Sequence, residues 1–210
     1  WAFNKNSTYK FSHSSVNDSL PKNINLKKLI WASVGKYPTN NLLKTNQVTL
    51  KDINLKNMPN FIGIDRALVC IAALNMFKNK ESKNLLIVDL GTTVSITKID
   101  NQGSILGGQL FPGFTTQLKS MEQSTKNLFF PDKIFIPNNK FEISTMDAML
   151  RGVYNSISGA IKISFDSAKD ILILCGGNAN LIGDSLKKEI KNLIVEPNLV
   201  MHGMIFLNKK

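Results

Sequence analysis

The hydrophobic pattern of the chain is clearest in its middle part, where it predicts three consecutive strands. Residues Leu85–Leu90 form a continuous apolar run, which is typical of a buried strand. Apolar and polar residues alternate over Thr93–Ile99, and Ser104–Leu110 forms a third segment of strand character. The residues Asp100–Gly103 between the last two segments have the composition of a tight turn. The pattern therefore predicts a β-meander.

After the meander, apolar residues recur at helical spacing. We expect helices over Thr115–Leu128, Thr145–Phe165 and Asn180–Leu193, with a short buried strand at Ile171–Cys175 before the last helix. Three strands, two helices, one strand and one helix, in this order, suit the second half of an actin-like, ribonuclease-H-like domain pair. That fold class is α/β, with mixed sheets in two domains hinged around a nucleotide cleft.

The N-terminal part is less regular. Residues 1–12 alternate weakly and predict one strand, and residues 13–25 have the Ser, Asn, Asp and Pro content of a loop. An apolar run within Leu26–Val34 predicts a buried strand, and a further short strand is expected at Gln47–Leu50. Apolar residues at helical spacing predict a helix over Asp65–Phe77.

This pattern divides the chain into two domains. Residues 1–80 are interpreted as the remainder of a first actin-like domain that is incomplete, because its opening strand and turn are absent. Residues 81–210 are interpreted as the second actin-like domain. With 210 residues, 43% of them apolar, the chain is long enough to bury a sizeable core.

Composition argues against several function classes. The formal charge of +11 invites a nucleic-acid interpretation, but only two of the 26 basic residues are Arg, and no basic run alternates with aromatic residues. A solvated Lys-rich surface explains the charge better. No apolar stretch approaches the ~20 residues of a membrane-spanning helix. Cys70 and Cys175 lie in apolar runs, which favours buried thiols in a reducing compartment, so we expect a cytoplasmic protein.

The segment Gly63-Ile64-Asp65-Arg66 stands where a loop enters a helix. In one interpretation, Asp65 caps the helix and Arg66 is solvated. In the other, Asp65 takes a proton from a substrate hydroxyl, Arg66 holds a substrate carboxylate, and Gly63 lets backbone approach the ligand. The residue types alone leave both interpretations open.

The segment Asp89-Leu90-Gly91-Thr92-Thr93 follows a buried strand directly. Glycine permits close approach, Thr hydroxyls and backbone N–H groups meet phosphate oxygens, and Asp89 holds a cation. An ordinary hairpin turn in which Asp89 bonds locally is the alternative. We favour the phosphate-and-cation turn.

Three further segments carry weaker signals. The glycines of Gly107–Gly113 fit either a bulge with a turn or a backbone wall of a substrate pocket. Ser144 or Thr145 caps a helix, or else Thr145 bonds a substrate. The turn Cys175–Ala179 either simply joins a strand to a helix or lets a nucleotide lie flat on its glycines.

The order of these segments resembles type III pantothenate kinases, the Bvg accessory factor-like family. G-x-D-R, D-x-G-T, G-G-x-x-x-P-G, a Thr at a helix start and a G-G-[DN]-A turn follow one another, from about Ile30 to the C-terminus. The most specific part of this resemblance lies between Pro59 and Gly113. The family's opening strand and its D-x-G-N-[ST] turn find no match here, so the chain resembles an N-terminally truncated member.

The resemblance implies phosphorylation of pantothenate to 4′-phosphopantothenate with ATP, the first step toward coenzyme A. It implies Asp65 as the general base and Gly63, Ile64, Asp65, Arg66 and Thr145 as pantothenate contacts. Thr92 would contact ATP, and Asp89 would hold a monovalent cation, K⁺ or NH₄⁺. Mg²⁺ would accompany the nucleotide, and the family works as a homodimer.

Two departures bear on this expectation. Lys56 takes the place of an aromatic Tyr that commonly precedes the G-x-D-R segment, and Asn178 stands where Asp is usual. The alternative to a kinase is a non-catalytic, pantothenate-binding or regulatory relative without the N-terminal phosphate turn. An electrostatic nucleic-acid binder is the third alternative.

Overall fold

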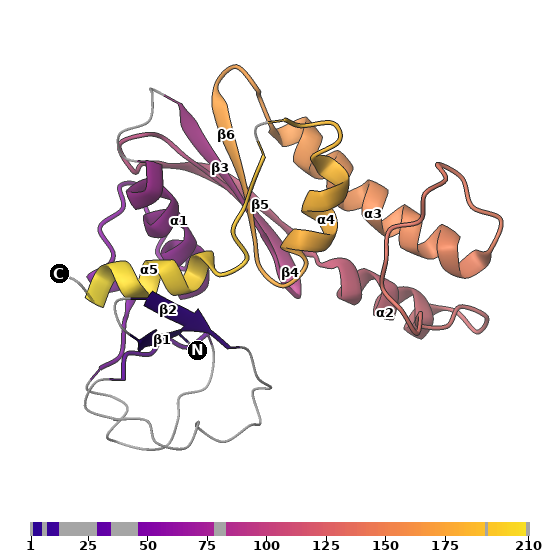
Figure 1. Ribbon diagram of the computed structural model, residues 1–210, viewed down its shortest axis with the longest axis horizontal. Coiled ribbons are helices and arrows are strands. Elements are labelled where there is room, and N and C mark those ends of the chain that lie inside the picture. The colour runs from indigo at the N-terminus through magenta and orange to yellow at the C-terminus, as the bar shows by residue number, and fades with distance from the viewer. Residues whose placement is uncertain are drawn as a thin grey trace.

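Figure 1 shows the computed structural model of the chain, which describes residues 2–5, 8–12, 29–34, 46–77, 83–191 and 193–208. Its centre is a five-stranded mixed sheet with the strand order β5-β4-β3-β6-β7. Among the described residues, no helix has both the length and the apolar character needed to cross a bilayer.

The sheet contains the predicted meander and one parallel addition to it. Strands β3 (Asn84–Leu90), β4 (Thr93–Ile99) and β5 (Ile105–Pro112) are antiparallel neighbours. Strand β6 (Asp170–Cys175) runs parallel to β3, and the short β7 (Ile194–Val195) runs parallel to β6. The three predicted strands of the meander and the strand before the last predicted helix are therefore confirmed.

Helices cover both faces of the sheet (Figure 1). One face carries α2 (Phe114–Ser124), α3 (Thr145–Ser164) and α4 (Ala179–Leu186), and the other carries α1 (Ile64–Phe77) and α5 (Leu199–Asn208). Strand β3 is buried on both sides, which explains its continuous apolar run.

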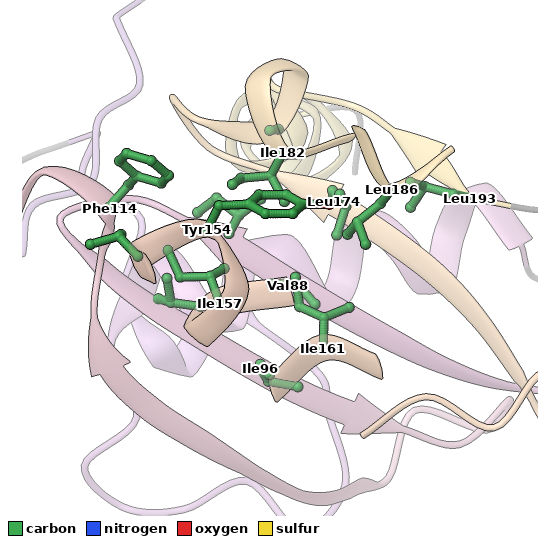
Figure 2. Packing of buried hydrophobic residues seen from close by; sticks show 14 of the residues in the cluster. Val88, Ile96, Phe114, Tyr154, Ile157, Ile161, Leu174, Ile182, Leu186 and Leu193 are labelled. Carbon is green, nitrogen blue, oxygen red and sulfur yellow. The ribbon is translucent and has the colours of Figure 1, made fainter. Parts of the chain in front are cut away.

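Figure 2 shows the core on the α3 face. Val88 and Ile96 of the sheet pack with Ile157 and Ile161 of α3 and with Ile182 of α4. Each of these five side chains is at most 2% exposed. Full burial of an aliphatic side chain contributes about 1.5–3 kcal/mol, so this core holds α3 and α4 firmly on the sheet.

The strand register decides which polar residues face α1. Successive residues of a strand point to opposite faces, so Asp89 points away from the α3 core that contains Val88. Thr97 of β4 is paired with Ile87, a member of the α1 core, and with Gly108 of β5. Asp89, Thr97 and Gly108 therefore lie on the face that α1 covers.

Helix α5 packs closely against α1, and the sequence pattern did not predict it. A Cβ at Gly203 would clash with the carbonyl oxygen of Leu68, so glycine lets the two helix backbones approach. Leu199, at the start of α5, is completely buried. Helix α1 thus shares a core with the sheet of residues 84–195, although the predicted division assigns it to residues 1–80. That division stays a prediction.

Several predicted boundaries in the N-terminal part need correction. Two antiparallel strands, β1 (Ala2–Lys5) and β2 (Thr8–Phe11), take the place of the single strand predicted over residues 1–12. The described part of the predicted strand Leu26–Val34 makes only an isolated bridge, between Trp31 and Gln47. A 3₁₀ turn at Leu50–Asp52 replaces the end of the strand expected there. The predicted loop 13–25 lies outside the described residues.

Two helices end earlier than predicted. Helix α2 stops at Ser124 because Thr125 is extended and its hydroxyl donates to the carbonyl of Met121, which closes the last turn. Helix α4 stops at Leu186, and the chain returns to the sheet so that Ile194 can pair with Ile173.

Candidate functional site at the carboxyl edge of the sheet

The turn between β3 and β4 lies at the centre of the candidate site. Asp89 is the penultimate residue of β3, and Gly91 and Thr92 form the turn after it. The turn after β6 lies against this segment, because a Cβ on Gly176 would clash with the carboxylate of Asp89. Gly176 also has a φ of 85°. Glycine is required at that position both for its backbone conformation and for the space.

Asp89 is a carboxylate in an unfavourable environment. Burial, and then the negative charge of Asp65, raise the pKa of Asp89 from its usual 3.8 to about 6. A cation beside Asp89 would relieve both effects, which fits the predicted monovalent-cation ligand. Among the described residues, no three His, Cys, Asp or Glu side chains lie together so that they could hold a metal ion.

Asp65 and Arg66 belong to the first turn of α1. The carboxylate of Asp65 accepts a hydrogen bond of 2.7 Å from the N–H of Arg66. A Cβ on Gly63 would come within 2.5 Å of that carboxylate, so Gly63 leaves it room. Asp65 is the second residue of α1, so it bonds the backbone of the first turn from within the helix and is not the N-cap that one interpretation expected. The negative charge of Asp65 also contributes to the raised pKa of Asp89, at the end of β3.

The side chain of Arg66 is held on the sheet by a hydrogen bond from its Nε. Its Nε donates to Thr97 Oγ1 at 2.6 Å, and its guanidinium lies over Gly108, where a Cβ would overlap Nη2. Among the described residues, no carboxylate forms an ion pair with Arg66. The half-buried guanidinium is therefore available to an anion from outside the chain.

The glycine-rich segment has a structural explanation in both of its parts. Gly107 has a φ of 141° at a β-bulge in β5, so the bulge interpretation is confirmed. Gly113 donates from its N–H to the carbonyl of Thr92 at 2.8 Å, and a side chain there would strike the carbonyl of Gly91. The segment therefore locks the start of α2 against the β3–β4 turn.

Thr145 is not brought to the other predicted residues within one chain. It is the exposed first residue of α3, whose buried side packs on the sheet face opposite α1. The cap of α3 is Ser144, whose Oγ accepts from the N–H of Asp147 at 3.5 Å. The hydroxyl of Thr145 is therefore not used as the helix cap.

A pocket of about 870 Å³ opens on the α2 side of the turn. The predicted ATP contact Thr92 lines it, as do Gly177 and Asn178 of the turn before α4. Its remaining wall is a polar side of α2 that sequence reasoning missed, because polar helix faces are usually solvated. The pocket is lined by Leu90, Gly91, Thr92, Thr115, Thr116, Lys119, Ser120, Gln123, Gly177 and Asn178.

This mixed sheet, with its strand order and its acidic glycine–threonine turn, places the chain in the actin-like ATPase fold class. Residues 12–166, more than half of the chain, match the sequence profile of type III pantothenate kinases. The chain belongs to that family.

Individual relatives agree with this assignment. A type III pantothenate kinase of Ehrlichia ruminantium is 31% identical over 177 residues, which cover 81% of this chain and 66% of the relative. One of Synechococcus elongatus is 29% identical over 164 residues, or 75% of this chain. The chain covers 64% of the length of that relative.

One solved structure supports the fold alone. The crystal structure of a conserved putative Baf family transcriptional activator from Campylobacter jejuni aligns with a TM-score of 0.60 at 24% sequence identity. The alignment covers 81% of this chain and 79% of that protein.

Proposed function

We propose that the protein transfers a phosphoryl group from ATP to pantothenate, which yields 4′-phosphopantothenate for coenzyme A synthesis. The observation that carries this proposal is the guanidinium of Arg66, which Thr97 holds over Gly108 on the sheet face that also carries Asp89. The candidate base Asp65 precedes Arg66 in α1, and the candidate cation ligand Asp89 precedes Leu90 and Gly91, which line the 870 Å³ pocket. Family membership is consistent with this arrangement.

The residues near the β3–β4 turn are suited to binding both pantothenate and ATP. Asp65 would accept the proton of the pantothenate hydroxyl, and the guanidinium of Arg66 would bind the pantothenate carboxylate. Thr92 and the backbone of the turn would hold phosphate oxygens on the pocket side. Phosphoryl transfer requires positioning and charge neutralisation more than covalent help, and these groups supply both.

Two kinds of cation belong to the proposal. Mg²⁺, when bound with ATP, would neutralise phosphate charge. Asp89 would hold K⁺ or NH₄⁺, because its desolvated carboxylate gains most from a neighbouring positive charge.

A second copy of the chain would complete the substrate site. Five large apolar side chains are exposed between α2 and the first residues of α3: Phe129, Phe135, Phe141, Ile143 and Met146. An exposed apolar surface of this kind is typical of protein interfaces. A homodimer that buries it would also cover the start of α3, and Thr145 of one copy would then be available to the pantothenate bound by the other.

The free thiols fit a reducing compartment such as the cytoplasm. Cys70 and Cys175 are both buried and unbridged, and burial raises the pKa of Cys70 to about 12. A thiol so rarely ionised is unreactive.

Pantothenate-dependent ADP release tests the proposal, with ATP, Mg²⁺ and K⁺ present. We expect release by the unchanged chain and its loss in Asp65→Asn. The matched control is Asp184→Asn, because Asp184 is an exposed carboxylate of α4 that does not line the pocket. Release that survives in Asp65→Asn would contradict the assignment of the base. Pantothenate binding without any release, by folded protein, would instead support a non-catalytic relative.

A further inference from the structure

One wall of the 870 Å³ pocket is a side of helix α2. Helix α2 contributes Thr115, Thr116, Lys119, Ser120 and Gln123 to it. Their positions repeat at intervals of four residues, so they form one side of the helix. This side is polar over its whole length, although α2 also buries Phe114 and Leu118 in the α3 core.

The wall is fixed relative to the β3–β4 turn. The hydroxyl of Thr116 donates to the carbonyl of Thr92 at 2.7 Å, and the N–H of Gly113 donates to the same oxygen at 2.8 Å. Two bonds to one carbonyl leave the start of α2 little freedom to move away from the turn. The distance from Thr92 to each later residue of α2 is therefore set by the helix itself.

Lys119 is the one charged side chain among the residues that line the pocket. The structure shows no hydrogen bond or ion pair between its ammonium group and any described residue. The same holds for the side chains of Ser120 and Gln123. The backbone of Lys119 is positioned by the contact between α2 and the β3–β4 turn, and its ammonium group makes no bond to a described residue, so it can bind an anion in the pocket.

Gln123 lies one further turn along α2. The rise of 1.5 Å per residue places Thr115 and Gln123 about 12 Å apart along the axis. The wall thus presents a hydroxyl end, a cationic middle and an amide end. An elongated ligand with an anionic end and a hydrogen-bonding heterocycle matches this order of groups.

We infer that the polar side of α2 is the nucleoside-recognition wall of the pocket. Lys119 binds the phosphate chain of the nucleotide, and the amide of Gln123 hydrogen-bonds its nucleoside part. The inference rests on the proposed kinase function for the identity of the ligand. It assigns nucleotide affinity to a helix that otherwise packs against α3.

Binding of AMP, ADP and ATP to the full chain, measured by titration calorimetry with Mg²⁺, tests the two assignments separately. Lys119→Gln should weaken ATP binding about tenfold and AMP binding much less, because the number of phosphates within reach differs. Gln123→Leu should weaken all three to a similar extent, about three- to tenfold. The matched control is Lys126→Gln, since Lys126 is an exposed lysine just beyond α2 and outside the pocket.

The outcomes separate this inference from the proposed function. If Lys119→Gln binds ATP as the unchanged chain does, or loses AMP and ATP affinity equally, the assignment of Lys119 is wrong. A Gln123→Leu chain with unchanged affinities overturns the assignment of Gln123. If the nucleotide results are as expected while pantothenate-dependent ADP release is absent, the nucleotide wall stands and the kinase proposal fails.

Discussion

The Nε of Arg66 donates to the hydroxyl of Thr97 at 2.6 Å, which joins the first turn of α1 to the middle of β4. Thr97 is 1% exposed, so this hydroxyl has little access to water as another partner. The bond uses only one of the five N–H donors of the guanidinium and leaves its two terminal nitrogens to others. Thr97 therefore orients a side chain that we propose to bind the substrate carboxylate.

Replacing Thr97 by valine should separate substrate affinity from turnover. Thr97→Val keeps the shape but removes the acceptor, so Arg66 loses its fixed orientation. We expect the KM for pantothenate to rise about tenfold while kcat and the KM for ATP change little. Steady-state kinetics measure this split. Thr97→Ser restores the hydroxyl and should recover most of the affinity. A Ser variant as weak as the Val variant would show that Thr97 acts through packing alone.

Gly108 should be equally important for the position of Arg66. A methyl group at Gly108 would overlap Nη2 of Arg66 and the carbonyl of Ile96, so Gly108→Ala must displace the guanidinium. We expect pantothenate binding to fall by at least tenfold, as measured by calorimetry. Gly159→Ala is the control, because Gly159 lies in α3 with open space around its Cβ position. That change should leave binding intact and stabilise the protein by about 0.5–1 kcal/mol. Normal pantothenate binding by Gly108→Ala would rule out this role for Gly108.

The sequence predicted the sheet well because its strands have strong local patterns. Residues Leu85–Leu90 are buried on both faces, and the turn Asp100–Gly103 is closed by the carboxylate of Asp100, which accepts from the N–H groups of Gln102 and Ser104. Helix α5 was missed because it is apolar on most of its surface and lies against α1 through Gly203. Its position depends on a tertiary contact that no local pattern records.

The candidate site was only partly predictable for a similar reason. Asp65 and Asp89 are 24 positions apart in the sequence, and only the register of β3 shows that Asp89 faces α1. The local sequence predicts only that Thr97 belongs to an alternating strand, because no neighbouring residue marks it as the hydrogen-bond acceptor for Arg66. Lys119 was likewise one lysine among many. Its place in the pocket follows from the contact between Thr116 and Thr92, which forms only in the folded chain.

The proposed dimer surface allows a sharp test of Thr145. Ile143 is fully exposed, so Ile143→Asp should not disturb the fold, but it places a charge in the apolar surface before α3. We expect the variant to be monomeric in light scattering and to have a raised KM for pantothenate, because Thr145 of the partner is lost. Ile163→Asp, at the other end of α3, is the control, since Ile163 is also highly exposed, at 90%. If Ile143→Asp remains dimeric, the dimer interface does not include the apolar surface before α3.

The raised pKa of Asp89 predicts that its burial destabilises the protein above about pH 6. Because this pKa is raised to about 6, the folded protein holds the proton more tightly than the unfolded chain, and the unfolding free energy falls as the pH rises from about 4 through 6. Asp89→Asn carries no charge to desolvate, so it should be more stable than the unchanged chain at pH 7.5, by up to about 3 kcal/mol. The difference should vanish below pH 4, where both side chains are neutral.

Denaturant unfolding at pH 7.5 and at pH 3.5 measures this effect, with Asp184→Asn as an exposed control. Potassium gives the second comparison. An ion held by Asp89 stabilises only the folded form, so added K⁺ should raise the stability of the unchanged chain and leave Asp89→Asn unaffected. Turnover should be lower in Asp89→Asn than in the unchanged chain, because the more stable Asn variant lacks the cation ligand. An Asn variant that is less stable at pH 7.5 than the unchanged chain would mean that the Asp89 carboxylate has a partner that outweighs its burial.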